Sequence, residues 1–150
     1  EELIKDGTLP SYFEAKKFQS QLEETNEKLM MCNEYTIKFG LALTPSQIKN
    51  LMQSRFNSLK DTGRVEFNEG VLEKLIFAFC DSPYIFQENY EETLAALQDC
   101  FYYFKNESHD LMSDDEIIEN MKAAFDGPAE GSVEYLTDIT LDDLYHKGKY

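Results

Sequence analysis

The chain has 150 residues, 42% of them hydrophobic, and a formal net charge of −15. Acidic residues are concentrated in the second half of the chain. Residues 75–146 include 17 acidic residues and only two basic ones, Lys105 and Lys122. A surface this acidic repels phosphate backbones and anionic lipid head groups, so we expect neither nucleic acid nor a membrane as a partner.

The first predicted helix starts at a capping box, Ser11 to Glu14. The serine oxygen accepts an early backbone N–H and the glutamate reaches back to the serine's own N–H. Gly40 ends the helix, because glycine readily takes the left-handed conformation of a C-cap. Apolar or small residues recur at steps of four and three, which marks one buried face: Phe18, Leu22, Thr25, Leu29, Cys32, Thr36 and Phe39.

A second box, Thr44-Pro45-Ser46-Gln47, opens the next helix with proline at its first position, where the missing N–H is harmless. Gly63 ends this helix. Its predicted buried side consists of Ile48, Met52, Phe56 and Leu59.

An extended piece, Arg64–Phe67, leads to a third helix that Asn68 can cap and Ser82-Pro83 ends. The long acidic helix that follows runs over residues 87–106. The buried side of the third helix is predicted to be Val71, Leu72, Leu75, Ile76, Phe79 and Cys80, and that of the acidic helix Tyr90, Leu94, Leu97, Phe101 and Phe104.

A third capping box, Ser113 to Glu116, begins a helix that Asp126-Gly127-Pro128 stops. Thr140 and Asp143 indicate a last short helix. The apolar residues of these two helices are Ile117, Ile118, Met121 and Phe125, then Leu141 and Leu144.

These elements predict a mainly α fold, a bundle of five to six helices in a single domain over residues 1–150. We expect loose ends at residues 1–8 and 147–150, and Glu1 in place of Met suggests further sequence upstream. Gly-x-Val-Glu-aromatic occurs twice, which raises the possibility of a small two-stranded ribbon that pairs Arg64–Phe67 with Ser132–Tyr135.

The second of these loops has the outline of an EF-hand, with Gly131 sixth and Val133 eighth if Asp126 is first. Pro128 stands where a side-chain oxygen is needed, and the twelfth position lacks the bidentate glutamate. A degenerate ion site would use Asp126, Glu130 and Glu134.

The sequence predicts no catalytic residue and no cofactor. Cys32, Cys80 and Cys100 are odd in number and lie in apolar helical settings, which predicts buried thiols in a reducing cytoplasm. Cys80 lies at a helix C-terminus beside Asp81, where the field raises a thiol pKa instead of activating it. No phosphate loop, nucleophile elbow or paired Cys-x-x-Cys is present, so we lean against an enzyme.

The segment between Lys74 and Lys105 holds nine of the 20 aromatic residues, five acids and no base. Four successive aromatics on a helix point about 100° apart, so Phe101 and Phe104 can share the core while their neighbours point elsewhere. Either this helix is central and surrounded, or its tyrosines form a contact surface. The candidate partner-binding residues are Tyr84, Phe86, Tyr102 and Tyr103.

From residue 32 to residue 144 the sequence resembles a family of small acidic proteins from Firmicutes, a domain of unknown function. The resemblance implies no activity, cofactor or catalytic residue; it implies a bacterial cytoplasmic protein, often encoded beside another protein, and thereby favours a partner. The strings that carry it are Phe39-Gly40-Leu41, Gly63-Arg64-Val65-Glu66-Phe67, Ala78-Phe79-Cys80-Asp81-Ser82-Pro83-Tyr84-Ile85, Gln87-Glu88-Asn89-Tyr90, Phe101-Tyr102-Tyr103-Phe104-Lys105-Asn106-Glu107 and Ser113-Asp114-Asp115-Glu116.

The leading hypothesis is an intracellular interaction module without catalytic activity, whose aromatic, acidic half binds another protein. Self-association is the variant in which the basic stretch Lys38 to Arg64 of a second copy is the partner. The alternatives are a divalent-ion-binding protein that uses the Asp126 loop, and a small enzyme with a deep pocket.

Overall fold

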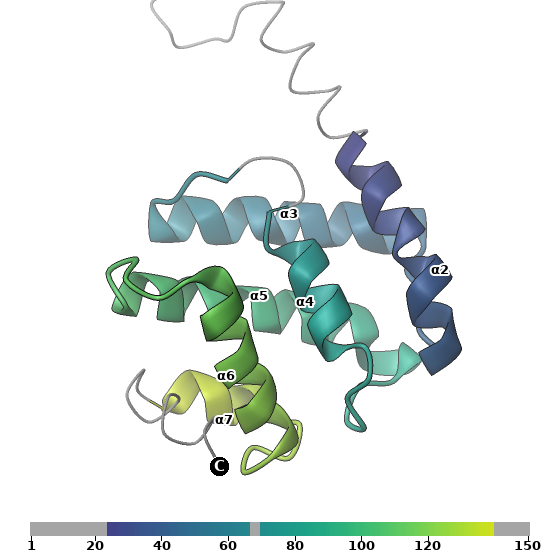
Figure 1. The fold of residues 1–150 in the computed structure, drawn as a ribbon. Helices are drawn as coiled ribbons and strands as arrows, with labels where there is room; N and C mark the ends of the chain where they lie inside the picture. Colours follow the sequence, from purple (N-terminus) through teal and green to yellow (C-terminus); the bar gives the residue numbers. More distant parts are fainter. Residues whose placement is uncertain (1–23, 67–69, 140–150) are drawn as a thin grey trace, which may run out of the picture.

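The computed structural model describes residues 24–66 and 70–139, and every regular element in them is helical (Figure 1). This confirms the prediction of a mainly α bundle. Residues 24–31 form a helix that leads into the elements α2 (Asn33–Thr36), η1 (Ile37–Phe39), α3 (Pro45–Thr62), α4 (Leu72–Phe79), η2 (Gln87–Asn89), α5 (Tyr90–Glu107), α6 (Asp114–Asp126) and α7 (Val133–Asp138).

Two predicted helix starts and two predicted helix ends rest on local capping chemistry, and the structure confirms these four. Thr44 and Ser113 each form a complete capping box at the starts of α3 and α6. Gly40 and Gly63 end η1 and α3 in the left-handed conformation, with φ of 80° and 68°.

The central element is α5, which packs against α3, α4, α6 and α7. Its long partner α3 runs parallel to it, because the contacts advance together along both chains: Asn50 donates to Glu91 at 3.0 Å, and Asn106 donates to the Thr62 carbonyl at 3.2 Å. In Figure 1, α3 and α5 cross the molecule in the same direction, while α4 and α6 cross α5. The prediction of a surrounded aromatic helix therefore holds for most of α5.

Aromatic side chains fill the core around α5. Phe79 and Phe125 meet edge to face, with ring centroids 5.4 Å apart, where α4 packs against α6. The largest fully buried side chains are Tyr90, Tyr102, Phe79, Phe101, Phe104 and Phe125.

The predicted ribbon is wrong. Residues 133–138 form α7 and not a strand, because the Ser132 hydroxyl accepts the Tyr135 N–H at 3.1 Å and caps a helix that buries Leu136. Phe67 of the other half lies outside the described residues. Three further predictions also fall there: the box at Ser11, the cap at Asn68 and the helix at Thr140 to Asp143.

Two predicted core aromatics are exposed. On α3 the buried side is Ile48, Leu51, Arg55 and Ser58, so Phe56 points outward. Polar partners set this rotation, because Arg55 pairs with Glu66 and the Ser58 hydroxyl donates to Asp99 of α5. Phe39 of η1 is also exposed.

Among the described helices, none is both long enough and apolar enough to cross a bilayer.

Candidate partner-binding surface

The four predicted contact residues have different environments. Tyr102 is fully buried, and its hydroxyl donates to Glu66, so the assignment of Tyr102 to a contact surface is wrong in this conformation. Tyr84 is half-buried, with its ring edge to face against Phe125. Phe86 and Tyr103 are exposed, at 56% and 44% of the surface of each residue.

The two exposed residues do not share one patch. Phe86 directly precedes η2 at the start of α5, whereas Tyr103 lies in the last turns of that helix. Thirteen residues of helix beyond Tyr90 correspond to about 20 Å. The predicted set therefore does not form a single docking surface.

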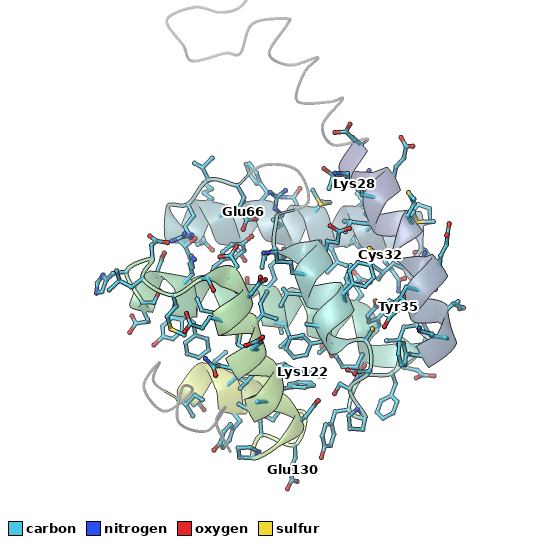
Figure 2. All side chains as sticks on the ribbon, in the orientation of Figure 1. Lys28, Cys32, Tyr35, Glu66, Lys122 and Glu130 are labelled. Carbon is cyan, nitrogen blue, oxygen red and sulfur yellow. The ribbon has the colours of Figure 1, made fainter. Side chains whose placement is uncertain are left out.

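The structure instead brings together an exposed aromatic cluster, Tyr35, Phe39 and Phe77. The Tyr35 ring lies 5.4 Å from that of Phe77 and 5.9 Å from that of Phe39, in tilted and edge-to-face arrangements. Each of the three is 41–44% exposed. Figure 2 marks Tyr35 on α2, beside α4, which carries Phe77. The aromatic cluster thus joins two segments that are far apart in the sequence.

A lysine covers part of the aromatic cluster. The Lys38 ammonium lies 3.9 Å from the centroid of the Tyr35 ring and 5.6 Å from that of Phe39. Both distances are within the range of cation–π attraction.

Phe77 also lines a groove of about 620 Å³ between α4 and α6, which we call the acidic groove. Its apolar lining includes Phe77, Ala78 and Ile118. Its charged lining consists of one lysine, Lys74, and three carboxylates. The one ammonium is already paired, with Asp115 at 3.0 Å. The three carboxylates belong to Glu73, Asp115 and Glu119.

Phe86 lies at the same end of the molecule as Phe39. The Gln87 side chain accepts the Ala42 N–H at 2.9 Å and donates to the Ala42 carbonyl at 2.9 Å, which ties η2 to the loop after η1. Of the predicted contact residues, Phe86 is thus the one held near the aromatic cluster.

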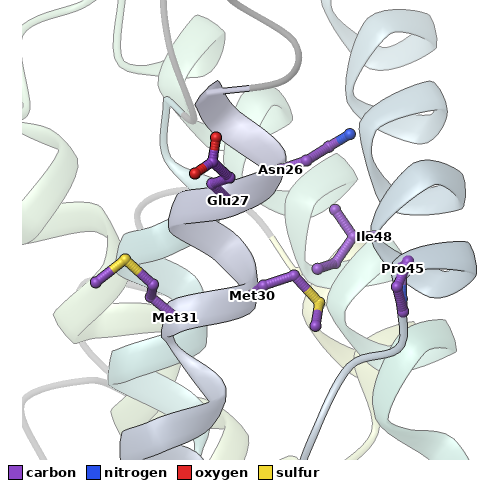
Figure 3. Close-up of a pocket in the computed structure, with 6 residues that line it drawn as sticks. All are labelled: Asn26, Glu27, Met30, Met31, Pro45 and Ile48. Carbon is purple, nitrogen blue, oxygen red and sulfur yellow. The ribbon is translucent and has the colours of Figure 1, made fainter.

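A second apolar depression, of about 270 Å³, lies between the helix at residues 24–31 and the start of α3. In Figure 3, Met30 points across it toward Pro45 and Ile48, whereas Met31 points away. It holds one carboxylate, that of Glu27.

In the loop considered for calcium binding, Asp126 already has other partners, and Glu130 and Glu134 are exposed. Asp126 accepts the Ser82 hydroxyl at 2.6 Å and pairs with Lys122 at 3.1 Å. Glu130, labelled at the edge of Figure 2, is exposed in a left-handed turn, and Glu134 is exposed on the first turn of α7. In the part of the chain that the structure describes, no group of three or more His, Cys, Asp or Glu could hold a metal ion. The arrangement does not favour ion binding.

All three cysteines are buried, as their apolar settings predict, and Cys80 and Cys100 are free thiols. Burial raises the pKa of the Cys100 thiol to about 12, and burial together with Asp81 raises that of Cys80. Thiols held in the protonated form are poor nucleophiles.

The interior also holds a polar cluster, which we call the Arg55 cluster: Arg55, Glu66 and Tyr102. Arg55 Nε lies 3.1 Å from Glu66 Oε1, and both side chains are largely buried. Within the described residues one Arg55 amino group and the whole Gln98 amide lack a hydrogen-bond partner. Burial, followed by the hydrogen bond to Glu66, raises the pKa of Tyr102.

Sequence reasoning missed the aromatic cluster because its three rings meet only in three dimensions. One signal was present: Phe77 falls off the buried side predicted for the third helix, so a large apolar residue was left for the surface. Phe39 gave the opposite signal, since it continues the apolar face of the first helix.

One comparison with known proteins gives a match. The model of a family of unknown function, DUF6323, matches residues 28–150. No curated protein and no solved structure matches the chain significantly.

Proposed function

This chain belongs to the DUF6323 family, whose function is unknown, and we propose that it is an interaction module that binds a basic, amphipathic segment of another protein. The binding surface is the aromatic cluster together with the acidic groove. Phe77 joins the two, because it contacts Tyr35 and also lines the groove.

The observation that carries the proposal is the exposure of three packed aromatic rings. Aromatic residues are enriched at the buried centres of protein interfaces, where they supply a large contact area. A contiguous exposed apolar patch with a polar rim is typical of an interaction site. Here the rim is acidic, which favours a partner with apolar residues on one helix face and lysines or arginines beside them.

A different protein is a better partner than a second copy. Two copies with a charge of −15 repel each other. The basic stretch that a second copy would offer is partly used within the chain, since Arg55 pairs with Glu66 and Arg64 pairs with Asp110 at 2.6 Å. Buried cysteines fit action in a reducing compartment such as the bacterial cytoplasm, and all described elements fit a single domain.

Affinity purification from the native cells tests the proposal with two matched variants. Phe77→Ser removes the shared ring, whereas Phe56→Ser removes a similarly exposed ring on α3. We expect one stoichiometric companion with the unaltered protein and with Phe56→Ser, and at least a tenfold loss of that companion with Phe77→Ser. Equal recovery with both variants would refute the surface.

The salt dependence of binding tests the charge argument. Because the acidic groove attracts a basic segment over a long range, the association rate should fall as ionic strength rises from about 0.05 to 0.5 M. The purified companion and surface plasmon resonance provide the measurement. A rate that is independent of salt would remove the electrostatic part of the proposal, and heat on calcium titration that Asp126→Ala abolishes would favour the ion-binding alternative.

A further inference from the structure

We infer that the aromatic cluster is a cation site, occupied by Lys38 in the free protein and taken over by a lysine or arginine side chain when the partner binds. This inference deepens the proposed function and rests on it. It names the group that the surface recognises, a side-chain ammonium or guanidinium.

The first support is where the Lys38 ammonium lies. The chain has 29 acidic residues, yet within residues 24–66 and 70–139 Lys38 takes part in none of the ion pairs. Its ammonium lies over two rings instead, 3.9 Å from the centroid of Tyr35 and 5.6 Å from that of Phe39. The faces of these rings carry negative potential and attract a cation. The position of the Lys38 ammonium therefore indicates that this site attracts cations.

The second support is the field around the rings. Phe77, whose ring lies 5.4 Å from that of Tyr35, is in the last turn of α4, so the aromatic cluster lies beside the C-terminal end of this helix. The C-terminus of a helix carries partial negative charge, which stabilises a cation. The site therefore combines ring faces with a helix end, and both favour positive charge.

The third support is the neighbouring groove. A cation seated on Tyr35 and Phe39 stands beside Phe77, and the chain that carries it can continue into the acidic groove. There three carboxylates face a single lysine, which Asp115 already pairs. A helical segment with a basic residue at the cluster and further basic residues over the groove satisfies both parts.

The consequence is competition between Lys38 and the incoming cation. A guest must displace the Lys38 ammonium before it contacts the rings, so Lys38 weakens binding and selects against groups that cannot replace it. Removal of the Lys38 charge should then strengthen the binding of cations. If Lys38 merely covered apolar surface, removal of its charge would not strengthen cation binding.

The test uses tetramethylammonium chloride as the probe and nuclear magnetic resonance of the full chain as the readout. Lys38→Met keeps an unbranched apolar side chain and removes the ammonium, and Lys60→Met makes the same change of charge near the end of α3. We expect the probe to shift the Tyr35 ring protons, with an apparent Kd at least about threefold lower in Lys38→Met than in Lys60→Met, the size of one exposed cation–π contact. Neutral 3,3-dimethylbutan-1-ol should give no comparable shift.

The inference is overturned if Lys38→Met and Lys60→Met bind the probe equally, or if the neutral alcohol binds as well as the cation. Tyr35→Leu in the Lys38→Met background should abolish the response, and a retained response would also overturn it. This probe needs no protein partner. A positive result here without any companion in affinity purification would therefore reject the proposed partner and keep the cation site.

Discussion

The α3–α5 interface and the surface around Phe77 reverse the usual distribution of residue types. The first buries Arg55 together with most of its partner Glu66, whereas the second leaves three aromatic residues 41–44% exposed. The difference shows that burial in this chain does not follow from residue type alone. Arg55 is inside because Glu66 supplies its counter-charge, and Phe77 is outside because α4 already buries its opposite side.

The strongest test of this contrast compares two phenylalanines of α4. Phe79→Ala should lower the free energy of unfolding by about 4 kcal/mol, because it opens a cavity against Phe125. Phe77→Ala should lower it by less than about 1 kcal/mol, since that ring is 43% exposed. Urea titration followed by circular dichroism measures both. Similar losses for the two variants would mean that Phe77 belongs to the core.

The next largest effect concerns the Arg55 cluster. Arg55→Met should cost about 3 kcal/mol, because it leaves the Glu66 carboxylate largely buried without its counter-charge. Arg55→Met combined with Glu66→Gln should cost markedly less, since no charge is then stranded and the Tyr102 hydroxyl keeps an acceptor. The same urea titration gives both values. A double variant with a lower free energy of unfolding than Arg55→Met alone would contradict this account.

A smaller effect is expected from substitutions that test how closely the backbone packs against the Arg55 cluster. Gly70 has φ of 56°, and a Cβ there would lie 2.0 Å from Glu66 Oε1. Gly40 also has positive φ, but no atom lies within 4 Å of its added Cβ. Both alanine variants pay about 1 kcal/mol of backbone strain, and we expect Gly70→Ala to lose roughly another 1 kcal/mol by displacing the Glu66 carboxylate. Equal thermal stabilities would show that Glu66 moves freely.

The smallest effect depends on pH. The folded pKa of Cys100 is about 12, above the ordinary 9.0, so the unfolded thiol ionises first as pH rises. The stability that this difference provides is complete below pH 9 and is lost between pH 9 and pH 12. We expect a loss of about 1 kcal/mol from pH 8 to pH 10, and a flatter profile for Cys100→Ala. An unchanged profile in that variant would assign the loss to other groups.

The sequence allowed those parts of the fold to be predicted that depend on neighbours along the chain. The boxes at Thr44 and Ser113 and the glycines after η1 and α3 act within four residues, so their residue types were sufficient. The face of α3 was misjudged because Ser58 is satisfied by Asp99, 41 residues away. The aromatic cluster was missed for the same reason. The contact of Tyr35 with a ring on α4 joins distant segments, so the periodicity of a single helix does not indicate it.

The parallel course of α3 and α5 has a consequence for how the chain folds. Two parallel helices cannot be joined by a tight turn, so the chain between them must return along the molecule, and α4 belongs to that return. Hydrogen bonds across this pair therefore close a loop of 41 residues, unlike the short closures of an up-and-down bundle. Such a non-local closure loses chain entropy before it gains contacts, which slows folding relative to helical proteins of local topology.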